Sequence, residues 1–120
     1  MSSITKESFK AGDYIFFEGD IESHFYIIES GHVKIFTKNA AGQKVELVKL
    51  GPGDTFGEFA LIDSGARTAS AQADTDAKVM KISEEGYKIM MNDLPLWASS
   101  MLGSFINRLK SMNNQLKAKK

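Results

Sequence analysis

The sequence predicts a mainly β fold, an antiparallel barrel or sandwich, followed by helices at its C-terminal end. Three observations support this class. Short apolar or alternating runs recur at near-regular spacing over the first two thirds of the 120-residue chain, with glycine-containing turns between them. No long helical pattern separates these runs, which argues against a parallel sheet with crossover helices. After Ser83 the apolar spacing becomes that of helices.

Turn residues bound the expected strands. Residues 33–37 and 45–50 each alternate apolar and polar side chains, and a hairpin loop over 39–42 joins them. The second run stops at a Gly-Pro-Gly turn signal. The other expected strands are 14–17, 25–28, 69–73 and 78–82, and the glycines expected in turns are Gly31, Gly51 and Gly53.

Two helices are expected after the last strand. Ser83 is placed to cap a helix that begins with two acidic residues and runs toward Met91. Pro95 then lies in the first turn of a final helix over about 96–116. Five apolar side chains of this helix form a seam with spacings of 3, 4, 3 and 4: Leu102, Phe105, Leu109, Met112 and Leu116. The seam predicts a homodimer through the helix, and the alternative is an amphipathic helix packed on its own barrel.

Composition indicates a single cytoplasmic domain over residues 1–120. Fifteen basic and fifteen acidic residues give no net charge, which argues against a nucleic-acid partner because such proteins need a basic face. The chain has no cysteine, so disulfides, thiolate zinc sites and cysteine nucleophiles are excluded. No run is apolar enough for a signal peptide or a membrane span.

Residues 56–70 carry the most informative chemistry. Glu58 and Arg67 lie nine positions apart, with a glycine-containing loop between them. A carboxylate accepts hydrogen bonds from a sugar hydroxyl, and a guanidinium binds a phosphate through two bonds. The segment therefore suits a ligand with a ribose and a single anionic phosphate, to which Gly57 allows close backbone approach. The alternatives are that Glu58 only caps a short helix and that Arg67 only pairs with Asp63.

Four segments resemble the cyclic nucleotide-binding domain family, which includes the bacterial catabolite activator, kinase regulatory subunits and cyclic-nucleotide-gated channels. The segments are 9–20, 25–34, 50–58 and 67–71, and they contain Gly-Asp-x-Phe-Gly-Glu followed by Arg-Thr-Ala. The resemblance implies an antiparallel β-roll of the double-stranded β-helix or jelly-roll type over about 9–83. It also implies a short phosphate-cassette helix within 56–70 and C-terminal helices over about 84–118, the last of them long.

The resemblance also implies the roles of the site residues. Glu58 would accept from the ribose 2′-hydroxyl, and Arg67 would pair with the cyclic phosphate, assisted by Thr68. Asn113 on the final helix, with its neighbours Met112 and Asn114, would approach the purine. The full expected set is Phe56, Gly57, Glu58, Phe59, Ala60, Arg67, Thr68, Ala69 and Asn113.

The implied ligand is cAMP or cGMP, and no metal is expected. Thr68 directly after the arginine resembles the channel-type members, in which this residue is associated with tolerance of cyclic GMP. Two departures from the common pattern are the bulky Phe59 and Ala66, which stands where many members have proline.

The function implied is that of a sensor or regulatory domain. Ligand binding would be transmitted through the C-terminal helix to a protein effector in trans, because the chain shows no output domain. One alternative is a ligand-free dimerisation or docking scaffold with the same fold. The other alternative is a metal-dependent enzyme on a cupin-type barrel, which would need a cluster of histidine and carboxylate ligands. The chain has only two histidines, His24 and His32, and it lacks the nucleophile elbow of a serine hydrolase. We therefore expect a binding module and no enzyme.

Overall fold

The computed structural model of the chain describes residues 4–58 and 66–118, with side chains as far as residue 112. Within these residues, eight strands precede two helices. The strands are β1 Ile4–Phe9, β2 Tyr14–Phe16, β3 Phe25–Ser30, β4 Val33–Lys38, β5 Lys44–Leu50, β6 Thr55–Phe56, β7 Ser70–Ala73 and β8 Ala77–Ile82. The helices are α1 Glu84–Asn92 and α2 Leu96–Ala118.

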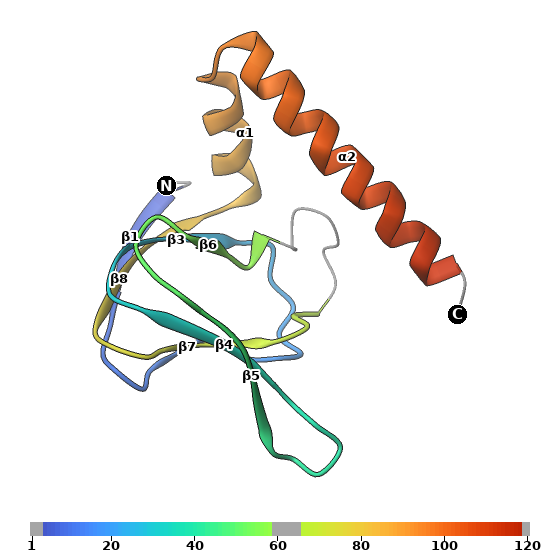
Figure 1. Cartoon of the computed structure of the whole chain (residues 1–120). Helices are drawn as coiled ribbons and strands as arrows, with labels where there is room; N and C mark the ends of the chain where they lie inside the picture. Colours follow the sequence, from blue (N-terminus) through green and yellow to red (C-terminus); the bar gives the residue numbers. More distant parts are fainter. Residues whose placement is uncertain (1–3, 59–65, 119–120) are drawn as a thin grey trace.

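Two four-stranded sheets form a β-roll (Figure 1). One sheet has the order β1-β8-β3-β6 and the other the order β2-β7-β4-β5. The pairs in both sheets are antiparallel, including β2 with β7 and β3 with β8, which lie far apart in the sequence. This arrangement confirms the predicted mainly β fold with C-terminal helices.

The core lies between the two sheets and is built from alternate residues of their strands. Val33 on β4 and Val79 on β8 have no exposed surface, and the rings of Tyr26 and Phe56 stack with centroids 4.9 Å apart. Burial of one such side chain stabilises the fold by about 1.5–3 kcal/mol. The buried cluster consists of Phe16, Tyr26, Ile28, Val33, Phe56, Ala71, Ala73, Ala77 and Val79.

Two strands were not predicted from the sequence. β1 is largely polar and runs along the edge of its sheet, where it pairs only with β8 among the described strands. Because most of its side chains are polar, β1 shows no alternation of apolar and polar residues from which a strand could be predicted. β6 has only two residues and is held by pairing with Tyr26 and Ile27 of β3, so it depends on a tertiary contact.

Gly31 is a turn glycine between β3 and β4, as predicted. Its φ of +82° is unfavourable for residues with a side chain. A Cβ atom at this position would also overlap the backbone carbonyl oxygen of Asp76. The turn is therefore packed directly against the loop between β7 and β8.

The two helices follow the predicted boundaries and leave the roll at one end (Figure 1). The Ser83 hydroxyl accepts a hydrogen bond of 3.0 Å from the Gly86 amide, so Ser83 is the predicted N-cap of α1. Tyr87 of α1 contacts Phe25 of β3 edge to face, with ring centroids 6.4 Å apart. This contact attaches α1 to the roll.

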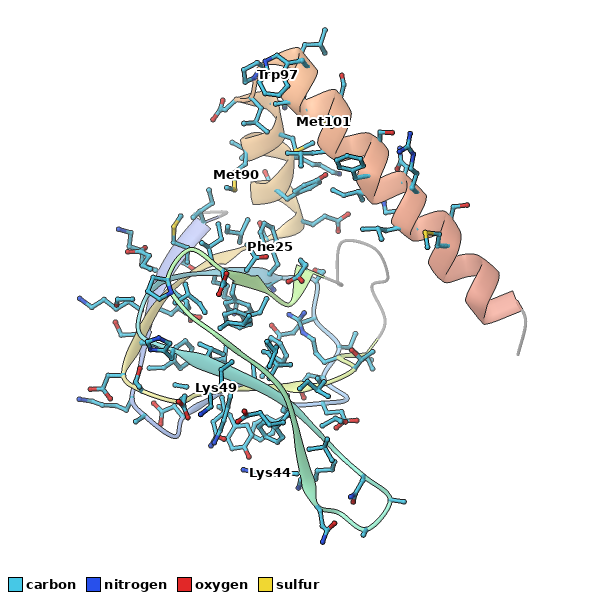
Figure 2. All side chains as sticks on the ribbon, in the orientation of Figure 1. Phe25, Lys44, Lys49, Met90, Trp97 and Met101 are labelled. Carbon is cyan, nitrogen blue, oxygen red and sulfur yellow. The ribbon has the colours of Figure 1, made fainter. Side chains whose placement is uncertain are left out.

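α2 turns back from α1 and lies apart from the strands (Figure 1). None of its side chains over residues 96–112 is buried. The seam residues Leu102, Phe105, Leu109 and Met112 are 43–59% exposed. Trp97, at the corner between α1 and α2, is also exposed (Figure 2). The alternative of a helix packed on its own barrel therefore does not hold for these side chains.

Candidate functional site

A cavity of about 250 Å³ lies between the two sheets, close to the lower size limit of about 300 Å³ for ligand pockets. It brings Glu58 and Arg67 together, as the sequence predicted. Strands β2, β4, β5 and β6 supply most of the remaining wall. The described lining residues are Phe16, Glu22, Ile35, Val48, Leu50, Thr55, Phe56, Gly57, Glu58, Ala66, Arg67, Thr68 and Ala69.

The backbone of Arg67 is anchored to the turn between β2 and β3. Its amide donates to the Asp20 carbonyl at 2.7 Å, and its carbonyl accepts from the Gly19 amide at 2.9 Å. An isolated bridge pairs the preceding residue, Ala66, with Ile21. These contacts fix the backbone at the point from which the Arg67 side chain enters the cavity wall.

The guanidinium of Arg67 is buried, with 7% of the residue exposed. Nη1 donates to the Gly57 carbonyl at 2.9 Å, and Nη2 donates to the His24 carbonyl at 2.6 Å. The Phe16 ring lies against the guanidinium, with Cζ 4.1 Å from the ring centroid. Nε has no hydrogen-bond partner among the described residues. A buried N–H left in this state costs about 1–3 kcal/mol, so the group favours a ligand that supplies an acceptor.

Gly57 adopts a φ of +75°, which favours glycine. A Cβ atom here would lie 3.0 Å from Arg67 Nη1, closer than ordinary contacts allow. Glycine is thus required both by the backbone conformation and by the approach of the arginine. The predicted close approach of Gly57 to a ligand stays a prediction.

Glu22 places a second carboxylate at the cavity. Its Oε1 atom lies 4.0 Å from Arg67 Nη2 and 3.7 Å from His24 Nδ1. Burial raises the pKa of Tyr26, and the nearby Glu22 carboxylate, to which its hydroxyl is hydrogen-bonded, raises it further. Tyr26 therefore stays neutral and donates to Glu22.

The charges of the described lining are Arg67, Glu22 and Glu58. Arg67 is the single cation of this set. An anion that enters the cavity consequently depends on Arg67 for its charge partner within the described wall.

Most of the expected site residues lie on this cavity. Thr68 is exposed and Ala69 is half-buried, and both line the wall. Phe56 is 3% exposed, so it belongs to the core as well as to the cavity. The remaining expectations lie outside the described residues or side chains: Phe59, Ala60, Asp63, Asn113, Asn114 and Leu116.

Several lining residues were missed by the sequence analysis. Ile35 shares the parity of the buried Val33, so its inward orientation was detectable, whereas the run 45–50 has apolar residues of both parities and left the orientation of Val48 and Leu50 open. Glu22 and Phe16 had no comparable signal, because they meet Arg67 only through the pairing of distant segments.

Comparison with known proteins places the whole roll in one family. The family model of the cyclic nucleotide-binding domain matches residues 6–93. The chain is 34% identical over 116 residues to the cyclic AMP receptor protein of Thermus thermophilus, covering 97% of this chain and 54% of that protein. It is 40% identical over 83 residues to the regulatory subunit of cAMP-dependent protein kinase of Emericella nidulans. That alignment covers 69% of this chain and 19% of the regulatory subunit.

A third relative is potassium/sodium hyperpolarization-activated cyclic nucleotide-gated channel 2 of Mus musculus. It is 34% identical over 109 residues, covering 91% of this chain and 12% of the channel. The chain thus spans about half the length of the receptor protein and a smaller part of the other two relatives.

Solved structures show the same fold. The Thermus thermophilus catabolite activator protein aligns with a TM-score of 0.75 at 33% identity, covering 97% of this chain and 55% of that chain. The half-site-occupied form of an EAL enzyme aligns with a TM-score of 0.83 at 28% identity, covering 91% of this chain and 97% of that chain. The cAMP-bound structure of PfPKA-R aligns with a TM-score of 0.68 at 29% identity, covering 72% of this chain and 31% of that chain.

The described residues contain neither a candidate membrane-spanning helix nor a candidate metal-binding group. Neither α1 nor the described part of α2 has the length and apolar content of a membrane-spanning helix. No group of three acidic or histidine side chains in residues 4–58 and 66–112 is arranged to hold a metal ion.

Proposed function

Because the chain belongs to the cyclic nucleotide-binding domain family, we propose that its cavity binds a purine cyclic nucleotide and that the domain acts as a sensor or regulatory module. One observation carries the proposal. The buried guanidinium of Arg67 lines the same cavity as Glu58 and retains an unpaired Nε–H donor. A cyclic phosphate supplies an acceptor for this donor and a negative charge that pairs with the guanidinium.

We propose a role in ligand binding for each group of lining residues. The cyclic phosphate pairs with Arg67, and the ribose 2′-hydroxyl donates to the Glu58 carboxylate. The apolar side chains of Ile35, Val48 and Leu50 offer a surface for the purine.

Cyclic AMP is the first candidate ligand. The receptor protein and the kinase regulatory subunit are both named for this nucleotide, and PfPKA-R was solved with it bound. Cyclic GMP is the second candidate, because the exposed hydroxyl of Thr68 lies on the cavity wall. A hydroxyl at this position can accept from the amino group of a guanine in the syn conformation.

We further propose that ligand binding is transmitted through α2. A nucleotide that touches both the cavity and α2, by way of Asn113, stabilises the arrangement in which the two are close. The same helix exposes the seam residues Leu102, Phe105, Leu109 and Met112, which fit a homodimer whose geometry changes with ligand. The output is then passed to a protein effector in trans.

A ligand-free dimerisation or docking scaffold remains the second candidate. The exposed seam favours it, because this surface requires a partner with or without a nucleotide. The unpaired Arg67 donor argues against a scaffold, since burying an unpaired N–H destabilises the fold and a scaffold has no ligand to offset that cost.

A cytoplasmic location stays a prediction from the sequence.

Titration calorimetry with cyclic AMP, cyclic GMP and linear 5′-AMP tests the proposal. We expect at least one cyclic nucleotide to bind well below about 1 mM and more tightly than 5′-AMP, which lacks the ring that joins phosphate and ribose. If neither cyclic nucleotide binds below about 1 mM, the sensor function is wrong and the scaffold is favoured.

A further inference from the structure

We infer that Phe16 is a positioning residue for ligand binding: its ring holds the Arg67 guanidinium in the orientation in which the unengaged N–H donors of that group bind the anion. The identity of that anion as a cyclic phosphate rests on the proposed function. The position of the ring does not, because it is a property of the free protein.

Three groups surround the guanidinium. The Gly57 and His24 carbonyls each take one Nη donor, at 2.9 and 2.6 Å. Phe16 covers it with a ring whose centroid is 4.1 Å from Cζ. The face of an aromatic ring carries partial negative charge and attracts a cation placed over it. The two carbonyls restrict rotation of the guanidinium, and the ring restricts its tilt.

This arrangement engages two of the five N–H donors of the guanidinium. Nε is buried and has no partner among the described residues. Glu22 does not supply an acceptor, because its Oε1 atom lies 4.0 Å from Nη2. That separation is longer than a hydrogen bond. A ligand anion therefore meets a guanidinium that keeps Nε–H and one N–H on each Nη as donors, in an orientation held by the two carbonyls and the ring.

The strands explain why Phe16 can act on Arg67. Phe16 on β2 is paired with Ala71 on β7, four residues after Arg67. Phe16 is 5% exposed and also contacts Tyr26 and Phe56, with ring centroids 5.9 and 6.0 Å away. The ring is thus fixed by the core on one side and meets the cation on the other. A purely structural role in the core is the competing explanation.

Nuclear magnetic resonance of the Arg67 Nε–H group tests the contact without any ligand. We expect the ring current of Phe16 to displace this resonance, and the displacement to disappear in Phe16→Leu or in Phe16→Met. Phe36→Leu is the matched control. It removes another buried ring, one that contacts the Lys44 ammonium at 4.7 Å and does not line the cavity. An unchanged Arg67 resonance in both Phe16 variants overturns the inference.

A double-mutant cycle on cyclic AMP affinity then separates positioning from packing. We expect Phe16→Leu and Phe16→Met to weaken binding about five- to tenfold, and Phe36→Leu by less than about twofold. In an Arg67→Lys background, the same Phe16 variants should cost less than about twofold, because lysine lacks the planar group that the ring orients. Equal losses in both backgrounds show that Phe16 acts through packing and overturn the inference.

The two measurements also separate this inference from the proposed function. Failure of the wild-type chain to bind any cyclic nucleotide contradicts the function, while the resonance still decides whether the ring orients Arg67. Wild-type binding that is unaffected by the Phe16 variants supports the function and overturns the inference.

Discussion

The Arg67 guanidinium shares its cavity with two carboxylates, Glu22 and Glu58. Their positions differ. Glu22 lies 4.0 Å from the guanidinium and is hydrogen-bonded to Tyr26, whereas Glu58 is exposed on the wall. Both carboxylates keep acceptor sites, and Glu58 is the more exposed of the two, which favours it as the acceptor for a ligand hydroxyl.

Arg67→Ala is expected to weaken cyclic nucleotide binding more than Glu58→Gln. The first change removes the single cation of the described wall, and a hydrogen bond to a charged group contributes about 1.5–3 kcal/mol, or roughly ten- to a hundredfold in affinity. Glu58→Gln keeps a side-chain oxygen that accepts a hydrogen bond from the ribose hydroxyl. Titration calorimetry measures both, with the exposed Lys6→Ala as control. Equal or reversed losses mean that the assigned roles are wrong.

Tyr26 links the cavity to stability at high pH. Its pKa is raised from the ordinary value near 10 by burial and then by Glu22, so the folded state holds a proton that the unfolded chain releases above about pH 10. This contribution is fully present below that pH and is lost as the pH rises. The free energy of unfolding should thus fall about 1.4 kcal/mol per pH unit more steeply in the wild type than in Tyr26→Phe. Urea unfolding between about pH 10 and 12 measures it, and parallel slopes over that range contradict the assignment.

At the scale of elements, α2 differs from most strands of the roll. Six of the eight strands contain at least one buried side chain, whereas no described side chain of α2 is buried. An apolar seam on a helix that contacts no core needs another surface, and a second copy of the same helix satisfies it by symmetry. Residues 102–112 are therefore the expected interface.

Leu109→Asp is expected to convert a dimer to a monomer, because it places a charge in the centre of the seam. Lys110→Asp is the matched control. It introduces the same side chain one position later, outside the seam, and should leave the dimer intact. Sedimentation velocity distinguishes the two. A monomeric wild type, or equal effects of both changes, contradicts an interface through this helix.

At the scale of the whole molecule, the cavity joins segments that only the closed roll brings together. Phe16, Ile35, Thr55 and Arg67 come from four separate parts of the chain and line one space. A ligand bound there contacts the folded state alone, because the unfolded chain has no such cavity. Binding must therefore raise the stability of the domain.

Cyclic AMP at about 100 times its dissociation constant should stabilise the domain by about 2.7 kcal/mol. For a chain of this length that corresponds to roughly 8–12 °C in melting temperature. Differential scanning calorimetry measures the shift. Arg67→Ala should lose most of it at the same nucleotide concentration, and a full shift in that variant shows that the ligand binds elsewhere.

The family, the β-roll and the helix boundaries were predictable from the sequence, and the comparisons and the structure confirm them. Alternation, turn glycines and the Ser83 cap are local signals, carried by residues a few positions apart. The pair Glu58 and Arg67 was predictable because one motif contains both. The site roles assigned to these residues stay predictions.

Only the tertiary structure showed β1, β6, the Phe16 ring against Arg67, and Glu22 beside them. Each depends on strand register between distant segments, which no local pattern encodes. The sequence by itself determined which cation serves the cavity. The packing of the two sheets decided how that cation is held and which of its donors are engaged, because both depend on groups that meet Arg67 only when the roll closes.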